Sequence, residues 1–540
     1  MHNIASTHSH SHQATHAMPL TDIAMVLDRN KVLEHRCGTL EAEVLQLKQQ
    51  VAWFQKQIFG QKSERRMIES SGLQGTLGYD LDDITHGELT SKKHRVQSHD
   101  RQSKRHKLND EVDDLGGLFF DESKVPIETI ILSNPDTTDL APDEYEIIGE
   151  KVSYRLAQRP GSYVVLKYIR PVIKRRDTQI ISCPPSPGSV IDGSRADVSF
   201  IVGLLIDKFC YHLPLYRQHQ RLIDAGLKLS RPWLTQLVSH AIALLEPIYA
   251  AQLTSILKSR VLTMDETLIK AGRLNLGKMK TGYFWPVYGE QDEICFPFFN
   301  NRNHRCVQDI LGTDRVEGSV LLSDGYEAYP QYAQKFNIIH AQCWAHSRRQ
   351  FFNAQNVEPQ LANEALDRMG ALYKLEGDIR ELRLAKDKKY DYRQKHAAPI
   401  VKAFFEWVDH RFEHHGLLPS NPFVKALAYV RKRQDALKVY LNDPDVPIDT
   451  NHLERALRPI PMGRKNWLFA WTELGAKHIG IIQSLITTCR LHDIDPYTYL
   501  VDVLQRINSH PQKLVEQLTP RLWKQHFADN PLRSDLSRAR

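Results

Sequence analysis

The sequence has few cysteines and no long apolar run, and each absence excludes a class of protein. Seven cysteines are scattered over 540 residues, which excludes a disulfide framework and indicates a reducing compartment. No run of eighteen apolar residues occurs, so we expect no transmembrane helix and no membrane partner. The N-terminus lacks the basic and apolar regions of a signal peptide, which favours a cytoplasmic location.

The composition is that of an ordinary globular protein with a modest excess of positive charge. Hydrophobic residues make up 41% of the chain and charged residues 25%, and the length suggests roughly three domains. The net charge of +7 permits a polyanionic partner without requiring one. Between Ser91 and Leu108 there are seven Lys or Arg and a single acid, and such a segment either neutralises phosphates or is a solvated linker.

The first 125 residues predict a polar arm that contains one long helix. Residues 1–28 include five histidines and are expected to form a disordered tail. Residues 29–60 carry apolar side chains alternately three and four positions apart, which favours a dimerising coiled coil over a helix packed on its own domain. Residues 61–125 are polar and charged and predict a basic linker.

Next, a small β-rich region precedes a group of helices. Residues 126–195 contain candidate short strands within 145–182. Residues 196–255 have a helical pattern with a break at Gly226 and a capped second helix. This is the outline of a helix-turn-helix, although any α-hairpin has the same outline. The side chains that would reach DNA from the second helix are Arg231, Gln236 and His240.

Residues 256–357 predict a mixed α/β sheet. Five runs of β-forming residues surround a short helical segment, Arg305–Leu311. The predicted strands are Arg260–Ile269, Gly282–Tyr288, Ile294–Phe299, Ser319–Ser323 and Ile338–Gln342. Three successive strands followed by alternating helix and strand are typical of such a sheet.

The rest of the chain predicts mainly helices. Residues 358–448 carry stripes of apolar residues at helical spacing and predict a large helical insertion. Residues 449–508 predict further helix that begins near Asn451. Residues 509–540 are expected to be a C-terminal tail.

Three acids stand where a metal site can form. Asp265 and Asp324 each end an apolar strand, and Glu454 lies in the first turn of a helix. Carboxylates at the ends of buried strands can converge at one edge of a sheet, and their oxygens suit Mg²⁺ or Mn²⁺. The alternative is structural: turn residues for the two aspartates, and a capping box with Asn451 for Glu454.

Several motifs in order resemble the transposases of the insertion sequence 66 family, in their large catalytic subunit. The resemblance extends over residues 30–508. The motifs that carry it are Ile58–Glu64, His212–Gln218, Leu229–Arg231, Asp265–Thr267, Ser323–Tyr326, Cys343–Phe351, Asn451–Arg455, Gly463–Trp467, Ser484–Ile486 and Asp495–Leu500. Long motifs in a fixed order are together highly specific.

The resemblance implies a fold and a catalytic site. The α/β block is expected to be the ribonuclease H-like core of an acidic-triad transposase, with residues 358–448 inserted between core elements. Asp265, Asp324 and Glu454 take the catalytic positions and are expected to bind two Mg²⁺ or Mn²⁺ ions. Metal-activated water would cleave the transposon end, and the freed 3′ hydroxyl would attack target DNA.

The resemblance also implies partners. These are double-stranded DNA of the transposon ends and the target, further copies of the chain, and small accessory proteins of the same element, in the cytoplasm of a bacterium at its nucleoid. Arg455, Arg464 and Lys465 follow the third acid and would bind phosphates, unless they form only a solvated basic helix face.

The sequence departs from the family pattern where the family usually has a cysteine-rich zinc module. Within residues 126–195 only Cys183 is present, so we predict an eroded module and no structural zinc. Cys343 and His346 form half of a zinc-binding pattern without a second pair, which favours a structural role.

A second departure leaves other functions open. The third motif has Thr450-Asn451 where the family often has two asparagines, which weakens one contact but leaves Glu454 intact. The alternatives to a transposase are a ribonuclease H-like nuclease without strand transfer and a DNA-binding repressor or inactive remnant. Only the last of these would be indifferent to Asp324→Asn.

Overall fold

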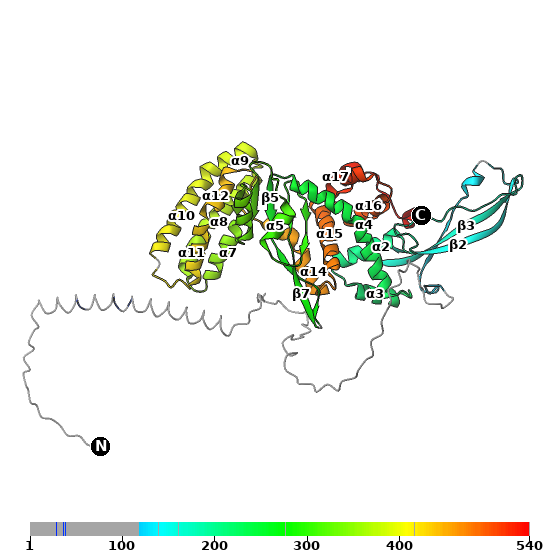
Figure 1. Ribbon diagram of the computed structural model, residues 1–540, viewed down its shortest axis with the longest axis horizontal. Coiled ribbons are helices and arrows are strands. Elements are labelled where there is room, and N and C mark those ends of the chain that lie inside the picture. The colour runs from blue at the N-terminus through cyan, green and yellow to red at the C-terminus, as the bar shows by residue number, and fades with distance from the viewer. Residues whose placement is uncertain are drawn as a thin grey trace, which may run out of the picture. The chain divides into compact units, whose positions relative to one another are not determined.

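The computed structural model describes residues 118–538, apart from single gaps at 139, 160, 276 and 415, together with the isolated residues 29, 36 and 38 (Figure 1). The predicted tail and coiled coil and most of the predicted linker therefore lie outside the described residues. Contacts divide the chain into a small unit, which includes Gln350–Asp367 and Phe412–Ala428, and a large unit that holds every predicted site residue.

One long hairpin dominates the predicted β-rich region. β2 (Tyr145–Arg159) and β3 (Ser162–Arg175) pair antiparallel, with Gly161 in the turn at a φ of +82° (Figure 1). β1 (Ile127–Ile131) pairs parallel with β3, and β4 (Ile181–Ser182) pairs antiparallel with it. The prediction of short strands is wrong for β2 and β3, because an antiparallel ladder tolerates the charged residues that interrupt their apolar pattern.

Three helices follow, and the last two have the predicted helix-turn-helix outline. α2 (Val198–Phe209) is largely buried. α3 (Leu215–Asp224) and α4 (Arg231–Leu257) are joined by a turn in which Gly226 has a φ of +89°. Ser230 caps α4, because its Oγ accepts a hydrogen bond from the backbone N–H of Trp233.

The main sheet has the strand order β12-β11-β5-β8-β9. Its strands are β5 (Val261–Met264), β8 (Val287–Tyr288), β9 (Ile294–Cys295), β11 (Val320–Ser323) and β12 (Ile339–Gln342). β12, β11 and β5 run parallel, whereas β5, β8 and β9 pair antiparallel. The mixed α/β class predicted from the sequence is confirmed.

The stretches of chain that form β5, β8 and β9 also contribute strands to a smaller antiparallel sheet. Its order is β10-β7-β6, and its strands are β6 (Thr267–Asn275), β7 (Lys278–Phe284) and β10 (Phe298–Phe299). Each of the first three predicted strands is therefore divided between two sheets. Pro286 and Pro297 lie in two of the breaks, where neither can donate a ladder hydrogen bond. The third break falls at Asp265 and Glu266.

Helices follow the strands and fill the interval before the third acid. α5 (His304–Leu311) occupies the predicted segment, α6 (Ala328–Lys335) follows β11, and α7 (Trp344–Ala354) follows β12. The helices within residues 358–448 are α8 (Pro359–Glu381), α9 (Lys386–Tyr392), the π-helical turn Arg393–Ala397, α10 (Ala398–Glu413), α11 (Pro422–Lys432) and α12 (Gln434–Asn442). α12 packs against β12.

The final part of the chain is also helical. Its helices are α13 (Asn451–Leu457), α14 (Pro459–Trp467), α15 (Glu473–Leu491), α16 (Pro496–Arg506), α17 (Pro520–His526) and α18 (Asp535–Arg538), with a 3₁₀ segment at Gln512–Leu518. α15 packs against α4 and β9.

The described part of the predicted C-terminal tail, residues 509–538, packs against the core. Trp523 is only 2% exposed, and its indole N–H donates to Asp502 of α16 over 3.1 Å. Leu518 is fully buried, and its carbonyl accepts a hydrogen bond from Tyr499. The bonded residues are 19 and 21 positions apart, beyond the spacing of a helical or strand pattern, so no local pattern predicts these contacts.

Candidate active site

Two of the predicted acids meet at one edge of the main sheet. Asp265 follows β5 and Asp324 follows β11, and these strands are parallel neighbours. Their carboxylates and that of Glu266 offer oxygens that all lie within 4.8 Å of one another. It is the one group of acids, histidines or cysteines among the described residues with such spacing.

The carboxylates of the two aspartates are only partly engaged. Asp265 Oδ1 accepts a hydrogen bond from the backbone N–H of Glu266 over 2.7 Å, and Asp324 Oδ1 accepts one from Tyr326 over 2.9 Å. The second oxygen of each aspartate has no hydrogen-bond donor among the described residues. Burial, followed by the negative charges of Glu266, Asp324 and Glu454, raises the pKa of Asp265 to about 8.

Glu454 approaches from α13. Its Oε1 is buried without a hydrogen-bond partner in the described part of the chain, and lies 3.8 Å from His346 Nε2. Its Oε2 lies 3.8 Å from an Arg349 guanidinium nitrogen. The capping box with Asn451 is not formed, because Asn451 is already helical and its side chain bonds to Asp449. A buried, unpartnered carboxylate oxygen is costly unless a cation or donor meets it.

Glu266 is an acid of the site that sequence reasoning did not single out. Its Oε1 is paired with the guanidinium of Arg302, and its Oε2 accepts a 2.6 Å hydrogen bond from Tyr329. Burial raises the pKa of this carboxyl. The available signal was its position beside Asp265, but its partners come from α6 and from the loop before α5.

Gly325, next to the second acid, lets Tyr429 and Arg433 pack closely against the backbone. A Cβ at this position would lie 2.5 Å from the Tyr429 hydroxyl. Arg433 donates to the Gly325 carbonyl over 3.1 Å and covers the ring of Tyr429, with its guanidinium carbon 3.9 Å from the ring centroid. Residues from the end of the helical insertion therefore hold the loop that carries Asp324.

Cys343 contacts the loop before α13. The sulfur is fully buried and lies 3.3 Å from both the backbone N–H and the hydroxyl of Thr450, which donate to it. Burial raises the pKa of the thiol to about 11. Thr450 thus joins the start of α7 to the start of α13. His346 lies one helical turn further on and faces Glu454.

The predicted DNA contacts fall in two places. Arg455 and Lys465 are exposed, and half-buried Arg464 donates to the backbone carbonyl of Leu268 on β6. Arg231 and Gln236 are exposed on the first turns of α4, where Arg231 lies over the ring of Tyr216. Among the described residues, no hydrogen bond or ion pair links Arg231 or Gln236 to the acids.

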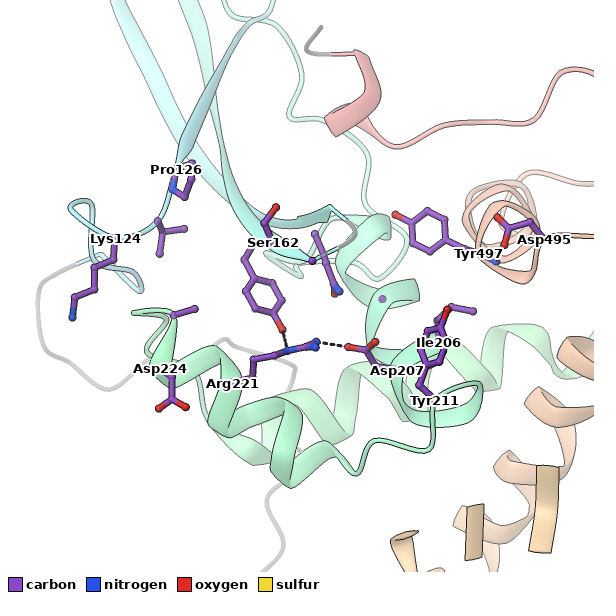
Figure 2. A pocket seen from close by; sticks show the side chains of 16 residues that line it. Lys124, Pro126, Ser162, Ile206, Asp207, Tyr211, Arg221, Asp224, Asp495 and Tyr497 are labelled. Atoms are coloured by element: carbon purple, nitrogen blue, oxygen red, sulfur yellow. Dashed lines mark hydrogen bonds and ion pairs between the residues drawn. The ribbon is translucent and has the colours of Figure 1, made fainter. Parts of the chain in front are cut away.

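A cavity of about 950 Å³ lies elsewhere, between the β2–β3 hairpin, α2, α3 and the start of α16 (Figure 2). Arg221 spans part of it, paired with Asp207 and donating to the Tyr163 hydroxyl over 2.8 Å (Figure 2). None of its lining residues belongs to the acidic group. Its ion pair between Arg221 and Asp207 is already formed, and Lys124 pairs with Asp121 outside the lining. The open carboxylates at the sheet edge are therefore the stronger candidate for chemistry.

None of the helices in the described ranges is both long and apolar enough to cross a membrane.

Comparisons with known proteins identify the family of the chain. Residues 484–521 match a family model described as IS66 C-terminal element, and residues 46–112 match one described as Transposase C of IS166 homeodomain. Among relatives in Sinorhizobium fredii, uncharacterized protein y4hP is 29% identical over 428 residues, covering 74% of this chain and 76% of the relative. Uncharacterized protein y4jD is 26% identical over 520 residues, covering 92% and 98%. Residues 193–478, more than half of the sequence, match the model described as Transposase IS66 family, and the chain therefore belongs to the IS66 family of transposases.

Proposed function

We propose that this transposase cleaves and joins DNA at the ends of an insertion sequence, with Asp265, Asp324 and Glu454 as its catalytic acids. The observation that carries the proposal is the meeting of Asp265 and Asp324 at the ends of two parallel strands. Glu454 lies close enough for its charge to raise the pKa of Asp265. The strand order, three antiparallel strands followed by two parallel ones, supports a ribonuclease H-like core.

The acidic site fits a divalent cation, and we infer that two Mg²⁺ or Mn²⁺ ions bind there. Three carboxyl groups share a partly buried space, and burial followed by their mutual repulsion raises the pKa of Asp265. Each of them has an oxygen without a hydrogen-bond donor among the described residues. Hard carboxylate oxygens are the ligands that these ions prefer. When bound, the ions supply Lewis acidity toward a phosphodiester and lower the pKa of water.

Glu454, rather than Glu266, is assigned as the third acid. Both oxygens of Glu266 are occupied, one by the Arg302 guanidinium and one by the Tyr329 hydroxyl. Oε1 of Glu454 is buried without a hydrogen-bond partner in the described structure. Glu266 then acts as a positioning residue, because its ion pair with Arg302 and its backbone N–H both fix the surroundings of Asp265.

The basic side chains next to the third acid are assigned to DNA phosphates. Arg455 and Lys465 are exposed on α13 and α14, where guanidinium and ammonium groups contact phosphates without reading bases. We assign Arg231 and Gln236, on the first turns of α4, to a separate DNA contact. The segment matched by the homeodomain model, residues 46–112, is a further proposed DNA-binding part.

The test is cleavage and joining of the DNA that flanks this gene, with Mg²⁺ or Mn²⁺, by the wild type and by Asp324→Asn. We expect the wild type to cut and join, and the variant to lose at least about 10²-fold in rate, as removal of one electrostatic stabiliser does. Cutting without joining by the wild type would instead identify a nuclease. Equal activity of the two proteins would refute the assignment of Asp324.

A further inference from the structure

The turn between α14 and α15 exposes large apolar side chains beside β6, the strand that follows Asp265. Leu468 is 63% exposed and Trp471 is 66% exposed, and the Phe469 ring contacts Trp471 edge-on, with ring centroids 5.0 Å apart. Exposed apolar side chains that gather in one place, unlike ones that stand singly, mark interaction sites. The turn belongs to the large unit, as do the acids.

The backbone of this turn is strained. Leu468 has a φ of 62° and a ψ of −56°, and the N–H of Phe469 donates to the carbonyl of Trp467 over 2.7 Å. This is a γ-turn with its central residue at positive φ, a rare and unfavourable conformation for a leucine. Strain of this kind persists where the surrounding structure imposes it, and it is concentrated at functional sites.

Hydrogen bonds to β6 impose that conformation. Ala470 N–H donates to the Lys270 carbonyl over 2.9 Å, and Gly272 N–H donates to the Ala470 carbonyl over 3.0 Å. Arg464, one helical turn before Leu468, donates to the carbonyl of Leu268. Leu268 lies three residues after Asp265 along the chain. The exposed turn is therefore tied to the strand that continues directly from the first catalytic acid.

The surroundings of the turn are positively charged. Residues 455–477 contain five Lys or Arg and one acid, Glu473. Glu473 is neutralised by an ion pair with Lys280 over 2.9 Å. A symmetric contact with a second copy of the chain would place this basic surface against itself, which like-charge repulsion opposes. The positive charge therefore favours a nucleic acid over a second copy of the chain as the partner that covers the exposed turn.

We propose that Leu468 and Trp471 form a wedge that stacks on an unpaired nucleobase of the DNA, beside the phosphodiester that the acids cleave. The inference rests on the proposed function and adds that the DNA substrate is locally unpaired beside the cleaved bond. An aromatic side chain can stack on the flat face of a base only when that base has left its neighbours in the duplex. Apolar wedges flanked by basic residues that contact phosphates stabilise such an opened step.

The experiment compares full-length wild type with Trp471→Ala on two DNAs, a fully paired end sequence and the same sequence with a mismatch beside the cleaved bond. We expect Trp471→Ala to cleave paired DNA about 5- to 150-fold more slowly, the range that loss of one stacked base supports. The mismatch is scanned through the positions next to the cut, and at one of them it should restore most of the rate, because the base is already unpaired.

Two further variants separate stacking from folding. Trp471→Phe keeps an aromatic face and should retain most of the rate on paired DNA. Tyr211→Ala removes an aromatic ring that is 72% exposed beside the cavity and away from the acids, and its rate should match the wild type.

The outcomes distinguish the wedge from the proposed function. An equal loss by Trp471→Ala on both DNAs, especially with a smaller oligomer in light scattering, would assign the turn to structure or to a second copy and overturn the wedge. Full activity of Trp471→Ala beside an active wild type would also overturn it. A wild type that cleaves neither DNA would overturn the proposed function, and the wedge with it.

Discussion

His452 Nε2 lies 3.2 Å from Thr263 Oγ1, and this contact joins the helix of the third acid to the strand of the first. Thr263 lies two residues before Asp265, and His452 lies two residues before Glu454. The His452 ring also packs edge-on against Tyr288 of β8, with ring centroids 4.8 Å apart. Burial lowers the pKa of His452, so the ring is neutral at pH 7. The spacing of two acids therefore depends on a contact between neutral side chains.

We predict that His452→Ala slows DNA cleavage by about 10- to 100-fold, the effect typical of losing a residue that orients a metal ligand. The reason is that α13 loses its polar anchor on β5, so Glu454 is placed less accurately. His452→Gln, which can still reach a hydroxyl, should recover part of the rate. His304→Ala, at an exposed histidine of α5, is the matched control, and an equal loss in that variant would contradict the role of His452.

Gly325→Ala is expected to slow cleavage by about 10-fold or more, because a displaced Asp324 forfeits alignment that chemistry requires. The added methyl group would meet the Tyr429 hydroxyl at 2.5 Å and push aside Arg433, which holds the loop. Gly370→Ala is the control, since a Cβ there meets nothing within 4 Å. That variant should keep full activity and gain about 0.5–1 kcal/mol in stability, because alanine favours the helix more than glycine does.

Glu376→Ala is expected to destabilise the protein by about 3–5 kcal/mol in urea denaturation, because it leaves a buried charge unpaired. Arg393 is fully buried and donates to both carboxylate oxygens of Glu376 at 2.8 and 2.9 Å. It also donates to the carbonyls of Tyr440, Asp443 and Val446.

Glu406→Ala provides the control for this ion pair. Glu406 pairs with Lys402 at the surface, where the two side chains are 66% and 80% exposed. Because water screens such a pair, the unfolding midpoint should hardly change. Similar losses of unfolding free energy in Glu376→Ala and Glu406→Ala would show that the buried ion pair contributes no more to stability than the surface pair.

Lowering the pH should reduce the free energy of unfolding through the protonation of His340. Burial, and then the positive charge of Arg433, lowers the pKa of His340 to about 4, whereas the unfolded chain binds a proton near 6.5. The unfolded state therefore holds more protons between these values, and stability falls as the pH drops from about 6.5 toward 4, by at most about 1.4 kcal/mol per unit. Thermal melts at pH 7 and pH 5 should show a smaller difference for His340→Asn than for the wild type. An unchanged difference would contradict this account.

The positions of Asp265 and Asp324 could be predicted because a short apolar strand that ends in an acid is a local signal. Parallel neighbours then bring those ends together without further information. Glu454 required the family resemblance, since its helix reaches the sheet through His452, whose partner Thr263 is far away in sequence.

Other features depended on distant contacts and were missed. Glu266 is held by Arg302 and Tyr329, which no local pattern connects to it. Gly325 excludes a side chain because Tyr429, more than 100 residues later in the chain, packs against it. Pro286 and Pro297 mark two of the three places where a predicted strand is divided between two sheets, and the β-forming residues around them mask this signal.

The most direct test of the central claim measures joining of precut end DNA to a target by Asp265→Asn, Asp324→Asn, Glu454→Gln and their pairwise combinations, beside Glu266→Gln. If the three acids form one site, each single variant should lose nearly all activity, and no double variant should be much worse than a single one, since residues that act as a unit are not additive. Glu266→Gln should retain measurable joining. A fully active Glu454→Gln beside an inactive Glu266→Gln would contradict the account and place the third catalytic carboxylate directly after the first.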